Sequence, residues 1–258
     1  MIPDVYFTAI QNAAGLLKAA RHAVAFTGAG ISTASGIPDF RSAGTGLWEK
    51  DDPMQVASLT SFLHTPNRFY NWLRPLARQC YSAQPNPAHL ALAELEELGI
   101  LKAIITQNID NLHHRAGSRN VIELHGSLRT FSCPACQRTS QDNQVIPGFI
   151  QSNSIPACPF CAAPLKPDIV LFEESLPAPA WHQAEDHARR ADVMLIVGSS
   201  LTVTPAAYIP LDALQAGAKI IIINLTSTFM DERAEVALPL SVAEALPLVV
   251  EQINNPSR

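Results

Sequence analysis

The hydrophobic positions of the chain gather in short runs that end in polar or glycine residues. The clearest runs are Ala23–Thr27, Leu101–Thr106, Val193–Val197 and Lys219–Ile223. Runs of this length, rich in Ile and Val and closed by turn-forming residues, are typical of parallel strands that are buried on both faces. Residues 121–124 form a further apolar run. The pattern therefore predicts a parallel sheet.

Helical patterns separate the predicted strands. Residues 5–20 carry Ile10, Leu16 and Leu17 among alanines, and residues 88–98 gather leucines on one side. Because strands that alternate with helices form a parallel sheet covered on both faces, we predict an α/β fold with a Rossmann-like domain. The segments of this domain are residues 1–38, 88–128 and 168–258.

Two stretches interrupt the alternation of strands and helices. Residues 39–87 carry aromatic side chains that are spaced like short helices around a loop. Residues 129–167 show almost no periodicity but contain two pairs of cysteines. We predict that these insertions form a smaller module, with a cofactor loop and helices at 39–87 and a zinc ribbon at 129–167.

The paired cysteines have the spacing of metal ligands. Cys133 and Cys136 form one CxxC pair, Cys158 and Cys161 form another, and 21 residues separate the pairs. Two such pairs supply four thiolates for a closed, tetrahedral Zn²⁺ site, which is structural rather than catalytic. The alternative is a pair of redox dithiols, although redox chemistry normally needs one CxxC beside a strand–helix turn. The fifth cysteine, Cys80, has no partner and is expected to be buried.

Composition and charge narrow the classes of function. The chain is 47% hydrophobic and 16% charged, which is typical of a globular enzyme. A net charge of −5 argues against non-specific nucleic-acid binding and weakly favours a lysine-rich partner. We see neither a membrane-spanning run of about 18 apolar residues nor a signal peptide, so we expect a cytoplasmic protein without nucleic-acid or membrane partners.

A glycine-containing turn follows the first predicted strand and leads into a predicted helix. Its candidate dinucleotide contacts are Gly28, Ala29, Gly30 and Ser32. Glycines at such a turn let the backbone approach a pyrophosphate, and free N–H groups at the helix start bind its oxygens. Because Thr33 replaces the third glycine of the dinucleotide fingerprint, a tight turn without a ligand stays open as an alternative. The next loop carries Asp39, Phe40 and Arg41, which can close over a cofactor.

Polar side chains also follow the second predicted strand. They belong to a segment formed by Gln107, Asn108, Ile109 and Asp110. Open α/β sheets bind ligands at such strand ends, and amides there can bond a ribose or a carboxamide. A single polar residue at this position would more often cap a helix.

A histidine follows the run at residues 121–124. A lone histidine is usually structural, but at a strand end near amides His125 suits general-base catalysis. His113 and His114 lack this setting and are expected on a helix surface. Two later strands end in small or amide residues that are placed to receive the adenosine half of a dinucleotide. These residues are Gly198, Ser199, Ser200, Asn224 and Leu225.

Taken in order, the motifs resemble those of the sirtuin family. They are GAGIS and SGIPDFR within residues 28–41, TQNID at 106–110, LHG at 124–126, the two CxxC pairs, GSS at 198–200 and INL around Asn224. The resemblance covers roughly residues 10–250 and is greatest to the compact bacterial and archaeal members.

The resemblance implies a Rossmann-like domain, a zinc-containing small domain and NAD-dependent deacylation of protein lysines. In that reaction the acyl-lysine carbonyl oxygen attacks the nicotinamide ribose of NAD, and the products are free lysine, nicotinamide and an O-acyl-ADP-ribose. His125 matches the family's catalytic base. Ile109 and Asp110 match residues that hold the nicotinamide carboxamide, and Gln107 and Asn108 match residues that order the ribose.

The resemblance also assigns the ends of the site. Its cofactor loop includes Ala29, Asp39, Phe40 and Arg41. Ser199, Ser200, Asn224 and Val242 match residues that meet adenosine. Val170 and Phe172 lie in the strand that pairs with the acylated peptide, and Tyr70 matches a residue near the acyl group.

The chain departs from the family pattern at three places. Glu173 replaces a glycine in the peptide-pairing strand, and the pair Leu240-Ser241 replaces Gly-Asp near the adenine contact. Family members that prefer succinyl or malonyl groups carry a Tyr-x-x-Arg pair. Here Leu73 stands three residues after Tyr70, where the arginine would fall, and Arg74 is one residue further along the helix, so its side chain points elsewhere. We therefore expect acetyl or longer apolar acyl groups.

Three other functions share part of the pattern. A mono-ADP-ribosyltransferase would use the same NAD site and pass the ribose to another acceptor. A dehydrogenase would share the glycine turn, but it would lack the combination of a zinc ribbon with the QNID and HG motifs. The strand-end polar groups disfavour a non-enzymatic zinc-ribbon adaptor.

Overall fold

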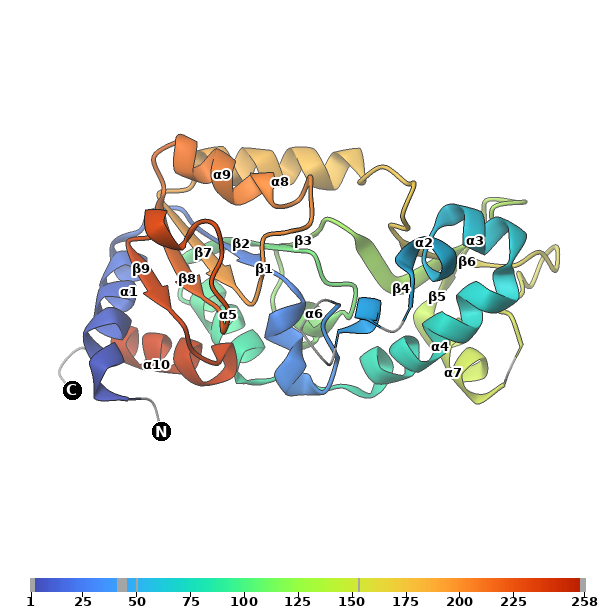
Figure 1. Ribbon diagram of the computed structural model, residues 1–258, viewed down its shortest axis with the longest axis horizontal. Coiled ribbons are helices and arrows are strands. Elements are labelled where there is room, and N and C mark those ends of the chain that lie inside the picture. Colours follow the sequence, from blue (N-terminus) through green and yellow to red (C-terminus); the bar gives the residue numbers. More distant parts are fainter. Residues whose placement is uncertain (1–2, 41–45, 50, 153, 256–258) are drawn as a thin grey trace.

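The computed structural model describes residues 3–40, 46–49, 51–152 and 154–255. Its main body is a six-stranded sheet in the order β3-β2-β1-β7-β8-β9, and every neighbouring pair is parallel (Figure 1). The strands are β1 (Ala23–Thr27), β2 (Leu101–Thr106), β3 (Val121–Glu123), β7 (Val193–Val197), β8 (Lys219–Ile223) and β9 (Val236–Leu238). The predicted fold class is therefore confirmed.

Helices cover both faces of this sheet. Alternate residues of β1 point to opposite sides, so Ala23 and Ala25 join one buried cluster while Val24 and Phe26 join another. The first cluster packs against α1 (Phe7–Ala19), α5 (Pro87–Glu97) and α10 (Val242–Asn254). The second packs against α8 (Ala178–Arg190) and α9 (Tyr208–Gln215), on the opposite side of the sheet in Figure 1. Burial on both faces explains why the central strands are apolar throughout.

A second, three-stranded antiparallel sheet lies beside the first in the order β5-β4-β6. Its strands are β4 (Gly126–Ser132), β5 (Thr139–Gln141) and β6 (Lys166–Ile169). It is accompanied by α2 (Pro53–Val56), α3 (Leu59–His64), α4 (Pro66–Ser82) and α7 (Asp142–Gln151), on the right of Figure 1. Residues of both groups share a third buried cluster, which we call the small-module core.

Short elements connect these parts. They are η1 (Asp4–Tyr6), η2 (Ala29–Ser35), η3 (Leu47–Glu49), α6 (Leu112–Arg115) and η4 (Asp231–Arg233). The turn after β1 therefore enters a 3-10 helix rather than an α-helix. No helix among the described residues is long and apolar enough to cross a membrane.

The two sheets meet at Gly126, the first residue of β4. Its φ is +70°, and a Cβ there would lie 2.1 Å from the carbonyl oxygen of Asp168. Only glycine combines this left-handed backbone with so close a neighbour. The carbonyl of His125 accepts a hydrogen bond from the N–H of Val170 at 2.8 Å. Gly126 thus fixes the position of His125 between the sheets.

Candidate active site and metal centre

A cavity of about 750 Å³ lies along the carboxyl ends of the parallel strands. Its wall includes residues that directly follow β1, β2, β7 and β8, together with His125, two residues after the end of β3. Fifteen predicted site residues line it: Gly28, Ala29, Gly30, Asp39, Phe40, Gln107, Asn108, Ile109, His125, Val170, Phe172, Gly198, Ser199, Ser200 and Asn224. The volume lies within the range of cofactor sites.

Five other predicted site residues that the structure describes do not line this cavity. Ser32 and Asp110 lie buried behind its wall. Tyr70 is fully buried in the small-module core, Val242 is buried at the start of α10, and Leu225 is 69% exposed. Their expected contacts with cofactor or substrate stay predictions. Arg41 lies outside the described residues.

His125 has one ring nitrogen fixed by the backbone. Its Nδ1 lies 2.9 Å from the carbonyl oxygen of Gln107. Because a carbonyl only accepts hydrogen bonds, Nδ1 carries the proton and the neutral ring has its basic lone pair on Nε2. The strand ends therefore select the tautomer that a general base on the cavity wall needs.

The segment after β2 is held against the glycine turn by side-chain hydrogen bonds. Asn108 Nδ2 donates to the carbonyl of Gly28 at 3.1 Å, and Gln107 Nε2 donates to Ser199 Oγ at 3.0 Å. Asp110 accepts from Ser32 Oγ at 2.7 Å. Burial raises the pKa of Asp110, although the hydroxyl of Ser32 opposes that rise. These bonds make the amides and the turn one connected wall.

The prediction for His113 is wrong, because this side chain is buried beneath the wall rather than exposed on a helix. Its Nε2 lies 2.9 Å from Thr27 Oγ1, which donates to Thr106 Oγ1 at 2.8 Å. Burial lowers the pKa of His113 well below its ordinary value and lowers that of neighbouring His89 to about 4. Both rings are therefore neutral near pH 7. His114 is half-buried on the same short helix.

The glycines of the first turn are required by the second turn that faces them. The N–H of Gly30 donates to the carbonyl of Gly198 at 2.8 Å. A Cβ on Gly30 would lie 2.7 Å from that oxygen, and Gly198 itself has a φ of +60°. Close packing of the two backbones thus explains these glycines without a ligand, and residues of both turns line the cavity.

Sequence reasoning missed an aromatic wall on the other side of the cavity. Trp48 lies 5.1 Å from Phe40, 5.6 Å from Trp72 and 5.9 Å from Phe172, measured between ring centroids. All four rings line the cavity. The aromatic spacing in residues 39–87 was the available signal, but it only indicated short helices. Further lining residues, Trp181 and the segment from Val203 to Pro205, belong to no recognisable motif.

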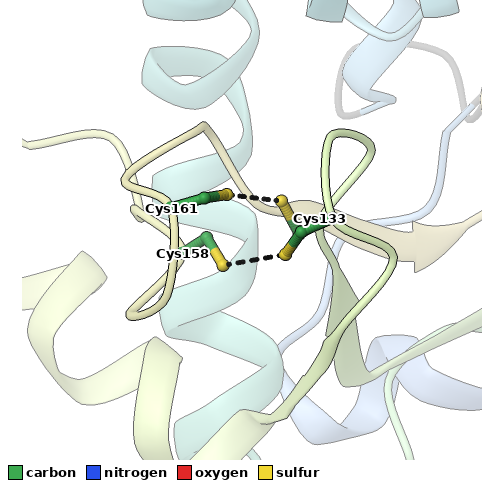
Figure 2. Close-up of side chains that lie close together, drawn as sticks. Cys133, Cys158 and Cys161 are labelled. Atoms are coloured by element: carbon green, nitrogen blue, oxygen red, sulfur yellow. Dashed lines mark hydrogen bonds between the residues drawn. The ribbon is translucent and has the colours of Figure 1, made fainter.

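The four paired cysteines come together in the small module, and all four Sγ atoms lie within 4.8 Å of one another. Figure 2 shows the side chains of Cys133, Cys158 and Cys161 pointing toward one another. Cys133 and Cys161 are 3.5 Å apart, and Cys136 and Cys158 are 3.6 Å apart. Tetrahedral zinc with Zn–S bonds of about 2.3 Å requires sulfurs separated by about 3.8 Å, so the arrangement fits Zn²⁺.

The backbone of each CxxC turn prepares its first sulfur for a metal. The N–H of Cys136 lowers the pKa of Cys133 to about 7, and the N–H of Phe160 lowers the pKa of Cys158. Zinc binds the thiolate form, which these donors stabilise. Cys80 is buried in the small-module core away from this cluster, as predicted.

The sequence profile of the Sir2 family matches residues 28–205. This chain belongs to the Sir2 family. It is 48% identical to an NAD-dependent protein deacetylase of Caldivirga maquilingensis, over 94% of this chain and 93% of the relative. It is 45% identical to NAD-dependent protein deacylase 2 of Archaeoglobus fulgidus, over 95% of this chain and 96% of that protein. The resemblance to sirtuins is therefore confirmed.

Solved Sir2 structures share the whole architecture. A structure described as a basis for the mechanism and regulation of Sir2 enzymes has a TM-score of 0.89 and 44% identity, covering 96% of this chain and 99% of its own. A Sir2 complex with a p53 peptide and NAD⁺ has a TM-score of 0.83 and 39% identity, covering 92% and 95%. A complex with a myristoylated histone peptide also scores 0.83 at 39% identity, covering 96% and 98%.

The residues of this Sir2 chain fit both of the groups that its family implies. Amides and hydroxyls from the ends of β2, β7 and β8 line one cavity and match the ribose hydroxyls and carboxamide of NAD in chemical type. The four-cysteine cluster matches structural zinc in number, identity and separation of its ligands. NAD and one structural Zn²⁺ are thus the cofactors of this protein.

Proposed function

We propose that this Sir2 enzyme removes acyl groups from protein lysines in an NAD-dependent reaction with His125 as general base. The observation that carries the assignment of the base is the contact of His125 Nδ1 with the Gln107 carbonyl, which leaves Nε2 basic. His125 also lines the same cavity as the glycine turn of the parallel sheet and the segment after β6. This position suits a base that acts where NAD and an acylated peptide meet.

Each part of the wall has a distinct task in this proposal. Bound NAD supplies an electrophilic ribose carbon, to which the acyl oxygen adds as nicotinamide leaves. Gln107 and Asn108, which are tied to the facing turns, orient the ribose. Ile109 meets the carboxamide, and buried Asp110 supports that segment through Ser32 and the N–H of Leu112. His125 then takes a proton from a ribose hydroxyl.

Other residues exclude water and complete the dinucleotide site. The Phe40 ring, packed against Trp48, shields the reacting carbon. Asp39 and the glycine turn border the phosphates, while Ser199, Ser200 and Asn224 border the adenosine half. A reducing compartment such as the cytoplasm would keep the four cysteines available for zinc.

The substrate is an acyl-lysine peptide with an apolar acyl group. No Lys or Arg is among the described residues that line the cavity, whereas four aromatic rings form one side. Leu73 is fully buried, and the guanidinium of Arg74 donates to the carbonyls of Phe149 and Ser154. Neither residue lines the cavity. A succinyl or malonyl carboxylate would therefore lose its water without gaining a described cation.

Matched peptides test this proposal. The wild-type enzyme and His125→Ala are given NAD with an acetyl-lysine peptide or a succinyl-lysine peptide of the same sequence, and nicotinamide release is measured. We expect deacetylation to exceed desuccinylation, and kcat to fall about 10²- to 10⁴-fold in His125→Ala because the base is lost. Unchanged turnover in His125→Ala would remove His125 from the mechanism, and faster desuccinylation would refute the acyl preference.

A further inference from the structure

The cavity wall after β6 is attached to the helical part of the small module. The N–H of Phe172 donates to the carbonyl of Ala57, and the carbonyl of Phe172 accepts from the N–H of Leu59, both at 3.0 Å. These bonds form an isolated bridge between Phe172 and Ser58, the residue that caps the start of α3. The backbone N–H and carbonyl of Phe172 are therefore both hydrogen-bonded to the segment before α3, while Phe172 also lines the cavity.

Glu173, the next residue, adopts a backbone conformation that disfavours it. Its φ is +76°, in the left-handed region where side chains other than glycine are strained. The sirtuin resemblance implies a glycine at this position. A compensating interaction of the Glu173 side chain is therefore expected.

The side chain of Glu173 supplies that interaction. Its Oε2 accepts a hydrogen bond from the N–H of Thr60 at 2.9 Å, in the first turn of α3. The first N–H groups of a helix have no partner within the helix, and a carboxylate there is also favoured by the helix dipole. Ser58 Oγ already accepts from the N–H of Ser61, so Glu173 completes the cap from a different segment.

The neighbouring glutamate holds the same segment from its other side. Glu174 Oε2 accepts from the N–H of Leu171 at 2.8 Å and lies 2.9 Å from Lys166 Nζ on β6. The wall segment is thus fastened to β6 through Glu174 and to α3 through Glu173. Both glutamates line the cavity where the acylated peptide is proposed to bind.

We propose that Glu173 is a positioning residue that fastens the peptide-binding wall to α3 before substrate arrives. This inference rests on the proposed deacylation. A wall already held in place loses less conformational freedom when the peptide binds, so the bond lowers KM for the peptide. The chemical step takes place at His125 and NAD, whereas the Glu173 side chain bonds to α3, so kcat is unaffected.

Four variants separate the hydrogen bond from charge and backbone strain. Glu173→Ala removes the acceptor and keeps a side chain at positive φ. Glu173→Gln keeps an acceptor oxygen without the charge. Glu173→Gly removes the acceptor and the strain together. Glu97→Ala, on the exposed surface of α5, is the matched control.

Deacetylation kinetics and amide hydrogen exchange are measured on each zinc-loaded enzyme, with an acetyl-lysine peptide and saturating NAD. Glu173→Ala and Glu173→Gly should raise KM for the peptide about three- to tenfold with kcat within about twofold, and Thr60 N–H should exchange faster. Glu173→Gln and Glu97→Ala should match the wild type in peptide KM and in Thr60 exchange.

Unchanged peptide KM in Glu173→Ala would overturn the inference. So would a Glu173→Gln enzyme as impaired as Glu173→Ala, or a Glu173→Gly enzyme with wild-type KM, since charge or strain would then be the cause. If the wild type does not deacetylate at all, the proposed function fails instead. Thr60 exchange in Glu173→Ala, relative to Glu173→Gln, still tests the attachment in that case.

Discussion

Replacing Gly126 with alanine tests how the two sheets position His125. The glycine has a φ of +70°, and the new Cβ would lie 2.1 Å from the Asp168 carbonyl oxygen and 3.1 Å from the Cα of Ile169. Backbone atoms of β6 cannot yield as a flexible side chain would. The start of β4 must therefore move away from β6, which breaks the pairing of Gly126 with Ile169.

The expected loss of stability follows from these contacts. A non-glycine residue in the left-handed region costs about 1–2 kcal/mol. Loss of the hydrogen bond from the N–H of Val170 to the carbonyl of His125 adds about 1 kcal/mol. Gly126→Ala should therefore lower the free energy of unfolding by about 2–3 kcal/mol, measured by urea denaturation. Because His125 immediately precedes this residue, kcat for deacetylation should fall as well in the folded fraction.

Gly15→Ala is the matched control. Gly15 lies exposed inside α1, and a Cβ there would meet no atom within 4 Å. Alanine should raise the free energy of unfolding by about 0.5–1 kcal/mol, because glycine weakens a helix interior. The reasoning is refuted if Gly126→Ala unfolds at the wild-type urea concentration, or if both substitutions shift the midpoint in the same direction.

Two further predictions concern the metal and the buried histidines. Metal analysis should find less zinc per chain in Cys161→Ser than in the wild type, whereas Cys80→Ala should keep one Zn²⁺ per chain. Cys161 belongs to the four-cysteine cluster and Cys80 does not. Equal zinc content in the two variants would contradict the assigned ligands. Burial lowers the pKa of His89 from 6.5 to about 4, so the folded protein holds this ring neutral. Below pH 6.5 the unfolded chain binds a proton at His89 that the folded chain does not bind. The free energy of unfolding is therefore fully retained above pH 6.5 and falls by about 3 kcal/mol as the pH drops toward 4. His89→Gln should lose less stability over the same range in acid urea titrations. An identical pH dependence in both proteins would refute this origin.

The central strands could be predicted because burial on both faces demands an apolar side chain at nearly every position. β1 and β7 are buried at all their residues, and the predicted bounds agree with the observed ones. The edge strand β9 escaped prediction because it has only three residues, of which Ala237 is exposed. The helix α10 has Pro247 in its interior, which obscures the helical pattern.

The site residues that follow strand ends could be predicted because the sheet brings those ends to one edge. His113 could not, since its burial depends on Thr27 and Thr106 from two different strands. The wall formed by Trp48 and Trp72 likewise depends on how distant helices meet. Tyr70 matches a family position in sequence, yet α4 turns it into the small-module core rather than toward the cavity.

The most direct test of the central claim is the product balance of the wild-type enzyme with NAD and an acetyl-lysine peptide, followed by mass spectrometry. We predict free peptide, nicotinamide and O-acetyl-ADP-ribose in equal amounts. ADP-ribose retained on protein without loss of the acetyl group would identify an ADP-ribosyltransferase, and NADH would identify a dehydrogenase. Either result would contradict the account.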